Sequence, residues 1–160
     1  MGLSKIRVNS NQPWWADYLP LLEKLEGEQI TPCEQLNALL PEGLKSETGK
    51  PIRFVPSTEL DDGPYEQRIY TTGQVSTRPD NWHDLFNALV WMRFPRIKIA
   101  MNTLHFHNWP EQTDGTRGQV RDALTLFDEC GVIVFSRRRD LLNALAGRRW
   151  TDAFLSLIHI

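Results

Sequence analysis

The chain has few cysteines, no long hydrophobic run and almost no excess charge. Its two cysteines, Cys33 and Cys130, lie far apart and form neither a CxxC pair nor a zinc-binding spacing. No apolar stretch approaches the roughly 18 residues that a membrane-spanning helix requires. The net charge of −2 argues against a general polyanion binder, so any basic surface is local. These absences favour a soluble, cytoplasmic protein whose cysteines are reduced.

The composition is typical of a folded globular protein. Hydrophobic residues make up 41% and charged residues 24% of the 160 residues, and this length suits one domain with a sizeable core. Six tryptophans and seven phenylalanines indicate a core or groove rich in flat rings. We therefore expect a single domain over residues 1–160.

The spacing of apolar residues predicts a mainly helical α+β fold. Helical periodicity is found over residues 13–26, with Pro20 as a kink or break, over residues 31–40 and over residues 138–146. Alternation predicts short strands over residues 52–55 and 65–72. Residues 123–135 favour a hairpin, with a helix through residue 129 as the alternative. The expected architecture is a helical domain with a small antiparallel sheet or hairpins and a central helical hairpin.

The central helical hairpin over residues 81–109 is the most informative stretch, and a proline divides it into two helices. In the first helix, His83 and Asn87 stand four residues apart, so their side chains can touch. In the second helix, Asn102 and His105 fall together on a face that differs from the apolar stripe. The hairpin therefore predicts a small polar site.

Three interpretations of this polar site stay open. His83, Asp84 and His105 are candidate ligands for a divalent metal, because imidazoles and carboxylates are usual ligands for zinc, iron and manganese. Asn87 and Asn102 would then orient those ligands. The same histidines and aspartate could instead perform general acid–base chemistry. The third interpretation is a hydrogen-bonded structural network in which Asp84 stabilises the helix start. The spacing matches no zinc motif, HExxH included.

Two arginine-containing stretches are further candidates. Arg117, Arg121 and Asp122 follow a glycine-containing loop, where arginines and backbone amides could hold a phosphate or a carboxylate. The alternative is an ordinary loop. Between residues 131 and 160, five arginines stand against two aspartates, so this section is basic. Nucleic-acid contact is one interpretation and a solvated helix face the other, because no DNA- or RNA-reading motif is present.

Several strings resemble one bacterial family. They are Gly-Lys-Pro-Ile-Arg-Phe-Val-Pro over residues 49–56, Tyr-Glu-Gln-Arg-Ile-Tyr over 65–70, Asn-Trp-His-Asp-Leu-Phe-Asn-Ala-Leu-Val-Trp over 81–91, and Arg-Asp-Ala-Leu-Thr-Leu-Phe-Asp-Glu over 121–129. Together they are similar to the family called domain of unknown function 3025. The resemblance implies a bacterial protein and supplies no catalytic assignment. Members are generally longer at the carboxyl end, and residues 155–160 resemble a translated sequencing adapter, so we expect the natural protein to continue.

The sequence thus predicts a bacterial cytoplasmic protein with a candidate polar site on the 81–109 hairpin. The alternatives are a metal-dependent hydrolase and a nucleic-acid or anionic-partner binding module. A further option is an interaction protein whose tryptophans line a partner groove. A divalent metal is the one cofactor that the residues suggest, and no motif names a substrate, a reaction or a partner.

Overall fold

The computed structural model describes residue 8 and residues 11–25, 32–109 and 118–158. Contacts between residues divide the chain into two compact units, Met1–Leu124 and Thr125–Ile160. We call them the N-terminal unit and the C-terminal unit and describe each by itself. The single domain over residues 1–160 stays a prediction.

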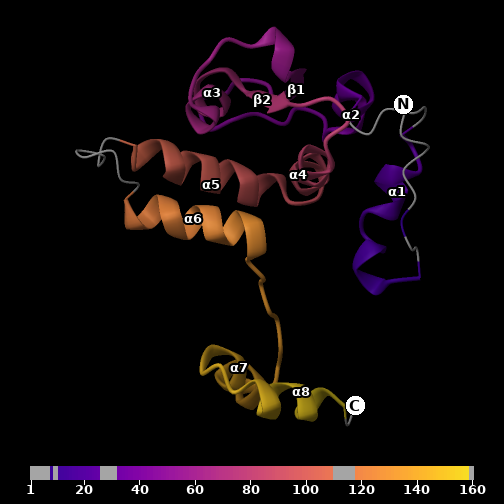
Figure 1. The fold of residues 1–160 in the computed structure, drawn as a ribbon, viewed down its shortest axis with the longest axis vertical. Helices are drawn as coiled ribbons and strands as arrows, with labels where there is room; N and C mark the ends of the chain where they lie inside the picture. Colours follow the sequence, from indigo (N-terminus) through magenta and orange to yellow (C-terminus); the bar gives the residue numbers. More distant parts are fainter. Residues whose placement is uncertain (1–7, 9–10, 26–31, 110–117, 159–160) are drawn as a thin grey trace. The chain divides into compact units, whose positions relative to one another are not determined.

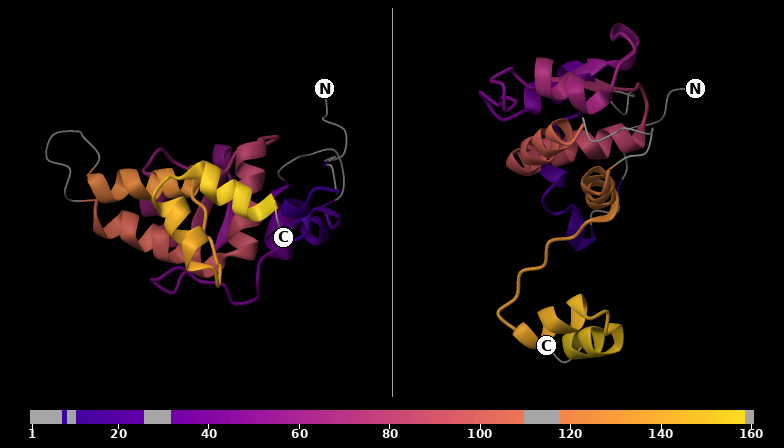
Figure 2. Two further views of the ribbon diagram at one scale, coloured as in Figure 1. Left: turned by 90° about the horizontal axis from the view of Figure 1, so that it is seen from below. Right: turned by 90° about the vertical axis from the view of Figure 1, so that its left-hand side faces the viewer.

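The N-terminal unit combines a two-stranded sheet with helices (Figure 1, Figure 2). Its elements are a 3₁₀ turn at Pro13–Trp15, α1 (Leu19–Leu22), α2 (Cys33–Leu39), β1 (Arg53–Pro56), a 3₁₀ turn at Ser57–Glu59, α3 (Tyr65–Thr72), β2 (Gln74–Thr77), α4 (Trp82–Arg93), α5 (Pro95–His107) and the first half of α6 (Gln119–Cys130). The C-terminal unit contains the rest of α6, α7 (Arg139–Ala146) and α8 (Trp150–Ile158). The predicted mainly helical α+β class is confirmed.

The sheet is parallel, with Phe54 of β1 opposite Val75 of β2. Helix α3 forms the crossover between the two strands. Parallel neighbours need such a crossover, because a tight turn reverses the chain direction. The predicted antiparallel sheet is therefore wrong.

Residues 65–72 form α3, so the strand predicted there is wrong. Tyr65 and Ile69 stand four residues apart, which suits one face of a helix as well as one face of a strand. Gly73 ends the helix with a φ of +75°, a left-handed conformation that glycine adopts without strain. The partner of β1 is instead β2, which begins directly after this glycine.

Two further predictions near the chain ends need correction. The hairpin over residues 123–135 is wrong and the alternative helix is confirmed, because α6 runs to Cys130. Its apolar residues recur at helical spacing at Val120, Ala123, Leu124 and Phe127. The helix over residues 13–26 is divided into the first 3₁₀ turn and α1, and Pro20 lies in the first turn of α1.

One side chain covers the outer edge of β1. The Asn37 amide nitrogen donates to the Phe54 carbonyl at 2.8 Å, and the Phe54 N–H donates to the Asn37 amide oxygen at 2.7 Å. The amide therefore satisfies the two backbone groups that a third strand would otherwise pair. Helix α2, which carries Asn37, packs against β1 as a result.

The core of the N-terminal unit lies between the sheet and the helices that pack on it. Its most deeply buried side chains are Leu36, Phe54, Ile69, Val75, Leu85, Ala88, Leu89 and Trp91. Helix α3 packs against α5 and β2, and α4 packs against α5. This packing holds the start of α4 beside the carboxyl end of β2, to which residues 78–81 connect it.

Candidate functional site

Asp84 in the first turn of α4 is the centre of a polar cluster at the end of β2. Its carboxylate accepts hydrogen bonds from the Arg78 side chain at 3.0 Å from Nε and 2.8 Å from a terminal nitrogen. The Arg78 backbone N–H donates to the same carboxylate at 2.8 Å. The Asn81 side chain accepts from the Asp84 N–H at 3.1 Å and caps the helix. Arg78 and Asn81 together hold Asp84 in one orientation.

The hydrogen bonds keep this carboxylate ionised. Burial by itself raises the pKa of the Asp84 carboxyl, but the hydrogen bonds from Arg78 and His83 outweigh it and lower the pKa to about 2. The same pair raises the pKa of the Arg78 guanidinium, chiefly through its hydrogen bond to Asp84. At neutral pH the two groups form a charged pair with bidentate geometry.

His83 contacts this carboxylate and is open to solvent. Its Nδ1 lies 3.0 Å from an Asp84 oxygen, and 73% of its side chain is exposed. A carboxylate beside Nδ1 favours the tautomer that carries its proton there, which leaves Nε2 as the nitrogen with the lone pair. His83 is therefore oriented by Asp84 with its basic nitrogen available.

Asn87 and Tyr65 extend the cluster to α3. The Asn87 amide donates to the Tyr65 hydroxyl at 2.9 Å. Tyr65 also contributes to the raised pKa of Arg78, so its phenol lies within electrostatic reach of that guanidinium. Side chains from α3, α4 and the end of β2 thus meet in one place. We call Tyr65, Arg78, His83, Asp84 and Asn87 the polar cluster.

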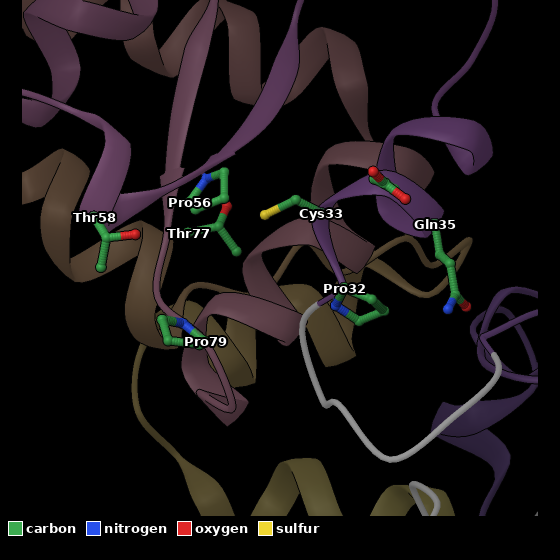
Figure 3. A pocket seen from close by; sticks show the side chains of 8 residues that line it. Pro32, Cys33, Gln35, Pro56, Thr58, Thr77 and Pro79 are labelled. Carbon is green, nitrogen blue, oxygen red and sulfur yellow. The ribbon is translucent and has the colours of Figure 1, made fainter.

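A groove of about 410 Å³ lies at the carboxyl ends of the two strands (Figure 3). Pro56 ends β1 and Thr77 ends β2, and both line the groove. Its other lining residues are Pro32, Cys33, Glu34, Gln35, Thr58 and Pro79. This edge of a parallel sheet is where open α/β sheets bind their ligands, and the volume falls within the range of small-molecule sites.

The cysteine in the groove is poorly suited to act as a nucleophile. The Cys33 sulfur points toward Thr77 (Figure 3). Burial raises the pKa of the Cys33 thiol, and a hydrogen bond with Thr77 offsets this only in part. A protonated thiol reacts slowly, because the thiolate is the nucleophile. Cys33 and Cys130 are both free.

The structure does not bring His105 to His83. At a rise of about 1.5 Å per residue, His83 lies about 18 Å and His105 about 15 Å along its own helix from the joint at Pro95. Figure 1 shows α4 almost end-on while α5 lies across the view, and Figure 2 agrees that the two helices cross steeply. His105 is buried at the far end of α5. The distant ends of two crossed helices cannot share a ligand.

Asn102 joins two helices instead of facing Asn87. Its amide donates to the Glu66 carbonyl at 2.8 Å and to a Glu66 carboxylate oxygen at 2.6 Å. These bonds fasten α5 to the first turn of α3. Among the described residues, no group of three His, Cys, Asp or Glu side chains is placed to hold a metal ion.

The other predicted residues are dispersed. Arg117 lies outside the described residues. Arg121 is buried, with its guanidinium 4.2 Å from the centre of the Trp109 ring, and Asp122 is exposed. Of the arginines in the C-terminal unit, Arg138 pairs with Asp140 at 2.6 Å and Arg149 pairs with Asp152 at 3.2 Å.

Sequence reasoning identified three members of the polar cluster, His83, Asp84 and Asn87, and missed Arg78 and Tyr65. Both missed residues stand next to turn signals, because Asp, Gly and Pro precede Tyr65 while Pro and Asp follow Arg78. Polar residues beside such turns lie where a strand ends or a helix begins, and these places are close to the ends of the sheet. This signal could have drawn attention to them.

The chain belongs to the family described as protein of unknown function (DUF3025), whose model matches residues 52–158. No curated protein and no solved structure matches the chain. In the described part of the chain, every helix is too short or too polar to cross a bilayer. The whole polar cluster lies inside the matched range, whereas Cys33 and the other α2 residues of the groove lie outside it.

Proposed function

We propose that this protein catalyses a proton-transfer reaction in which His83 is the base and Asp84 its orienting carboxylate. The observation that carries the proposal is the 3.0 Å contact between His83 Nδ1 and a carboxylate that Arg78 already holds in place. A fixed, ionised carboxylate stabilises the imidazolium that forms when Nε2 takes a proton. An exposed ring gives the substrate access to that nitrogen.

The groove at the ends of the strands supports a small molecule as the substrate. Arg78 stands between Thr77 and Pro79 in the chain, and both of these residues line the groove. Arg78, which holds the Asp84 carboxylate, is thus a direct chain neighbour of two groove residues, while in the described part of the chain no member of the polar cluster lines the groove itself. Prolines supply apolar contact, while the hydroxyl groups of Thr58 and Thr77 supply hydrogen-bonding partners.

Hydrolysis of 4-nitrophenyl acetate tests the base, because a neutral imidazole assists this reaction without a specific binding pocket. We expect His83→Ala to lose most of the rate above background and Asp84→Asn to lose part of it. His107→Ala is the matched control, since His107 is also exposed and lies on α5. Equal rates for the wild type and His83→Ala, or an equal loss in His107→Ala, would contradict the proposal.

A cytoplasmic location and a bacterial origin belong to the same proposal. Two free cysteines without a disulfide framework support the cytoplasm, and the family resemblance supports the origin. Fractionation of cells that produce the protein tests the location. A metal-dependent hydrolase and a nucleic-acid or anion-binding module stay predictions, which elemental analysis and gel-shift titration at low salt would test.

A further inference from the structure

The Tyr65 hydroxyl lies about one helical turn from the base His83. His83 and Asn87 stand four residues apart on α4, and side chains at this spacing are neighbours, with about 5–6 Å between their Cβ atoms. The Asn87 amide nitrogen lies 2.9 Å from the hydroxyl oxygen of Tyr65, the first residue of α3. Asn87 therefore holds the Tyr65 hydroxyl beside the face of α4 that carries His83.

A second series of contacts joins Tyr65 to His83. The pKa of the Arg78 guanidinium is raised chiefly by its hydrogen bond to Asp84 and, to a smaller extent, by the nearby Tyr65. The Asp84 carboxylate, which Arg78 holds, lies 3.0 Å from His83 Nδ1. Tyr65 is thus linked to His83 through Asn87 on one side and through Arg78 and Asp84 on the other. All of these contacts lie within the N-terminal unit.

Asn87 fixes the direction of the Tyr65 hydroxyl. The amide N–H donates and the hydroxyl oxygen accepts, so the single phenol proton is directed away from the Asn87 nitrogen. The donated hydrogen bond and the nearby Arg78 cation both stabilise negative charge on the phenol oxygen. They make the Tyr65 O–H a stronger hydrogen-bond donor. Such a donor is suited to an oxygen on which negative charge develops during a reaction.

The exposure of His83 favours water as the source of the proton. Because 73% of its side chain is exposed, water reaches Nε2. Removal of a proton from carbon calls instead for a closed site, which keeps water from competing for the base. When a base activates water against a carbonyl group, negative charge develops on the carbonyl oxygen. A base and a hydroxyl donor side by side therefore suit the hydrolysis of an acyl compound.

We propose that the substrate is a small ester or other acyl compound whose carbonyl oxygen accepts a hydrogen bond from Tyr65, which rests on the proposed role of His83 as the base. His83 Nε2 takes a proton from water while the water oxygen bonds to the carbonyl carbon, and the π electron pair moves to the carbonyl oxygen. When this pair re-forms the C=O bond, the bond to the leaving group breaks. The leaving group departs with the electron pair of that bond, and the proton on His83 passes to it or to solvent. Tyr65 keeps its own proton throughout.

Hydrolysis of two esters by the full chain tests the role of Tyr65. They are 4-nitrophenyl acetate and its thiono analogue, in which sulfur replaces the carbonyl oxygen. Because sulfur is a weak hydrogen-bond acceptor, Tyr65→Phe should leave the rate with the thiono ester almost unchanged. With the oxygen ester, the same variant should lower the rate above background about fivefold, as expected for the loss of one hydrogen bond. Tyr70→Phe is the matched control, since Tyr70 also lies on α3 and its ring stacks on Phe106.

The two esters and the His83→Ala variant distinguish the role of Tyr65 from that of His83. If His83→Ala loses the rate while Tyr65→Phe keeps it, Tyr65 has no part in the reaction and His83 remains the base. Equal losses with both esters in Tyr65→Phe would indicate a structural role and overturn the hydrogen bond to substrate, as would an equal loss in Tyr70→Phe. A full rate in His83→Ala would overturn both roles. Circular dichroism shows whether each variant keeps its helices.

Discussion

The two units of this protein differ in how completely they bury their apolar side chains. The N-terminal unit gathers side chains from the sheet and from α2, α3 and α4 into one core in which several are fully buried. In the described part of the C-terminal unit, the buried apolar cluster consists of Leu141, Ala144 and Ala153. Nine larger apolar residues there are exposed instead. A core of this size supplies little stability on its own.

The largest effect is expected when one buried leucine in each unit is truncated to alanine. Leu85→Ala should destabilise the N-terminal unit by about 3–5 kcal/mol, because the residue is fully buried and its truncation leaves a cavity. Leu141→Ala should open only the C-terminal unit. Hydrogen exchange measured by mass spectrometry at increasing urea concentrations reports the opening of each unit separately. Equal loss of protection in both units for either variant would contradict the difference.

Two glycine-to-alanine variants, one in each unit, extend the same comparison. Gly73→Ala should cost about 3 kcal/mol or more, because the left-handed conformation disfavours alanine and the new methyl group would meet the Pro51 carbonyl. Gly147 at the end of α7 has a φ of −80°, and a methyl group there would lie 3.1 Å from the Asn143 carbonyl. Gly147→Ala should therefore be much milder. Thermal unfolding ranks the two variants, and the reverse ranking would count against this account.

The Asp84 ion pair predicts a smaller, pH-dependent effect. The pKa of Asp84 falls from its ordinary 3.8 to about 2 in the folded protein. The pair therefore stabilises the fold by about 2 kcal/mol above pH 4, and this contribution disappears as the pH falls towards 2. Asp84→Asn should remove it. Urea unfolding of both proteins from pH 7 to pH 2 tests this, and a constant difference across that range would argue against the ion pair.

The smallest effect is expected at a surface pair of the C-terminal unit. Arg149 and Asp152 are both more than half exposed and lie 3.2 Å apart. Exposed pairs contribute little, because solvent screens the charges and the side chains lose freedom. Asp152→Asn should change the free energy of unfolding by less than about 0.5 kcal/mol. A loss as large as that of Asp84→Asn would show that exposure is the wrong basis for comparing the two pairs.

Local sequence signals predicted the two central helices well. Pro95 begins α5, and Asn81 caps α4 through its side chain. Both signals act within one helical turn, so a short window of sequence contains them. The same reasoning failed for residues 65–72, because the few apolar positions of an eight-residue segment fit either period. In the folded protein β1 pairs with β2, and residues 65–72 form the helix between the two strands.

The residues of the polar site also divide into those that local sequence signals predicted and those that they did not. His83, Asp84 and Asn87 were predicted together because one helix carries all three. Asn102 and His105 were grouped with them on the assumption that two helices joined by a proline lie side by side, whereas α4 and α5 cross steeply (Figure 1). Arg78 and Tyr65 come from other elements, and no spacing within the hairpin could point to them.

The amino-acid sequence by itself determined the family, the helical class and the positions of caps and prolines, since each depends on residues a few positions apart. The tertiary structure alone decided that the strands run parallel, that Arg78 holds Asp84, and that the two histidines separate. These depend on which distant segments bury each other's apolar faces. Packing across the whole unit sets that choice, and no short window of residues contains it.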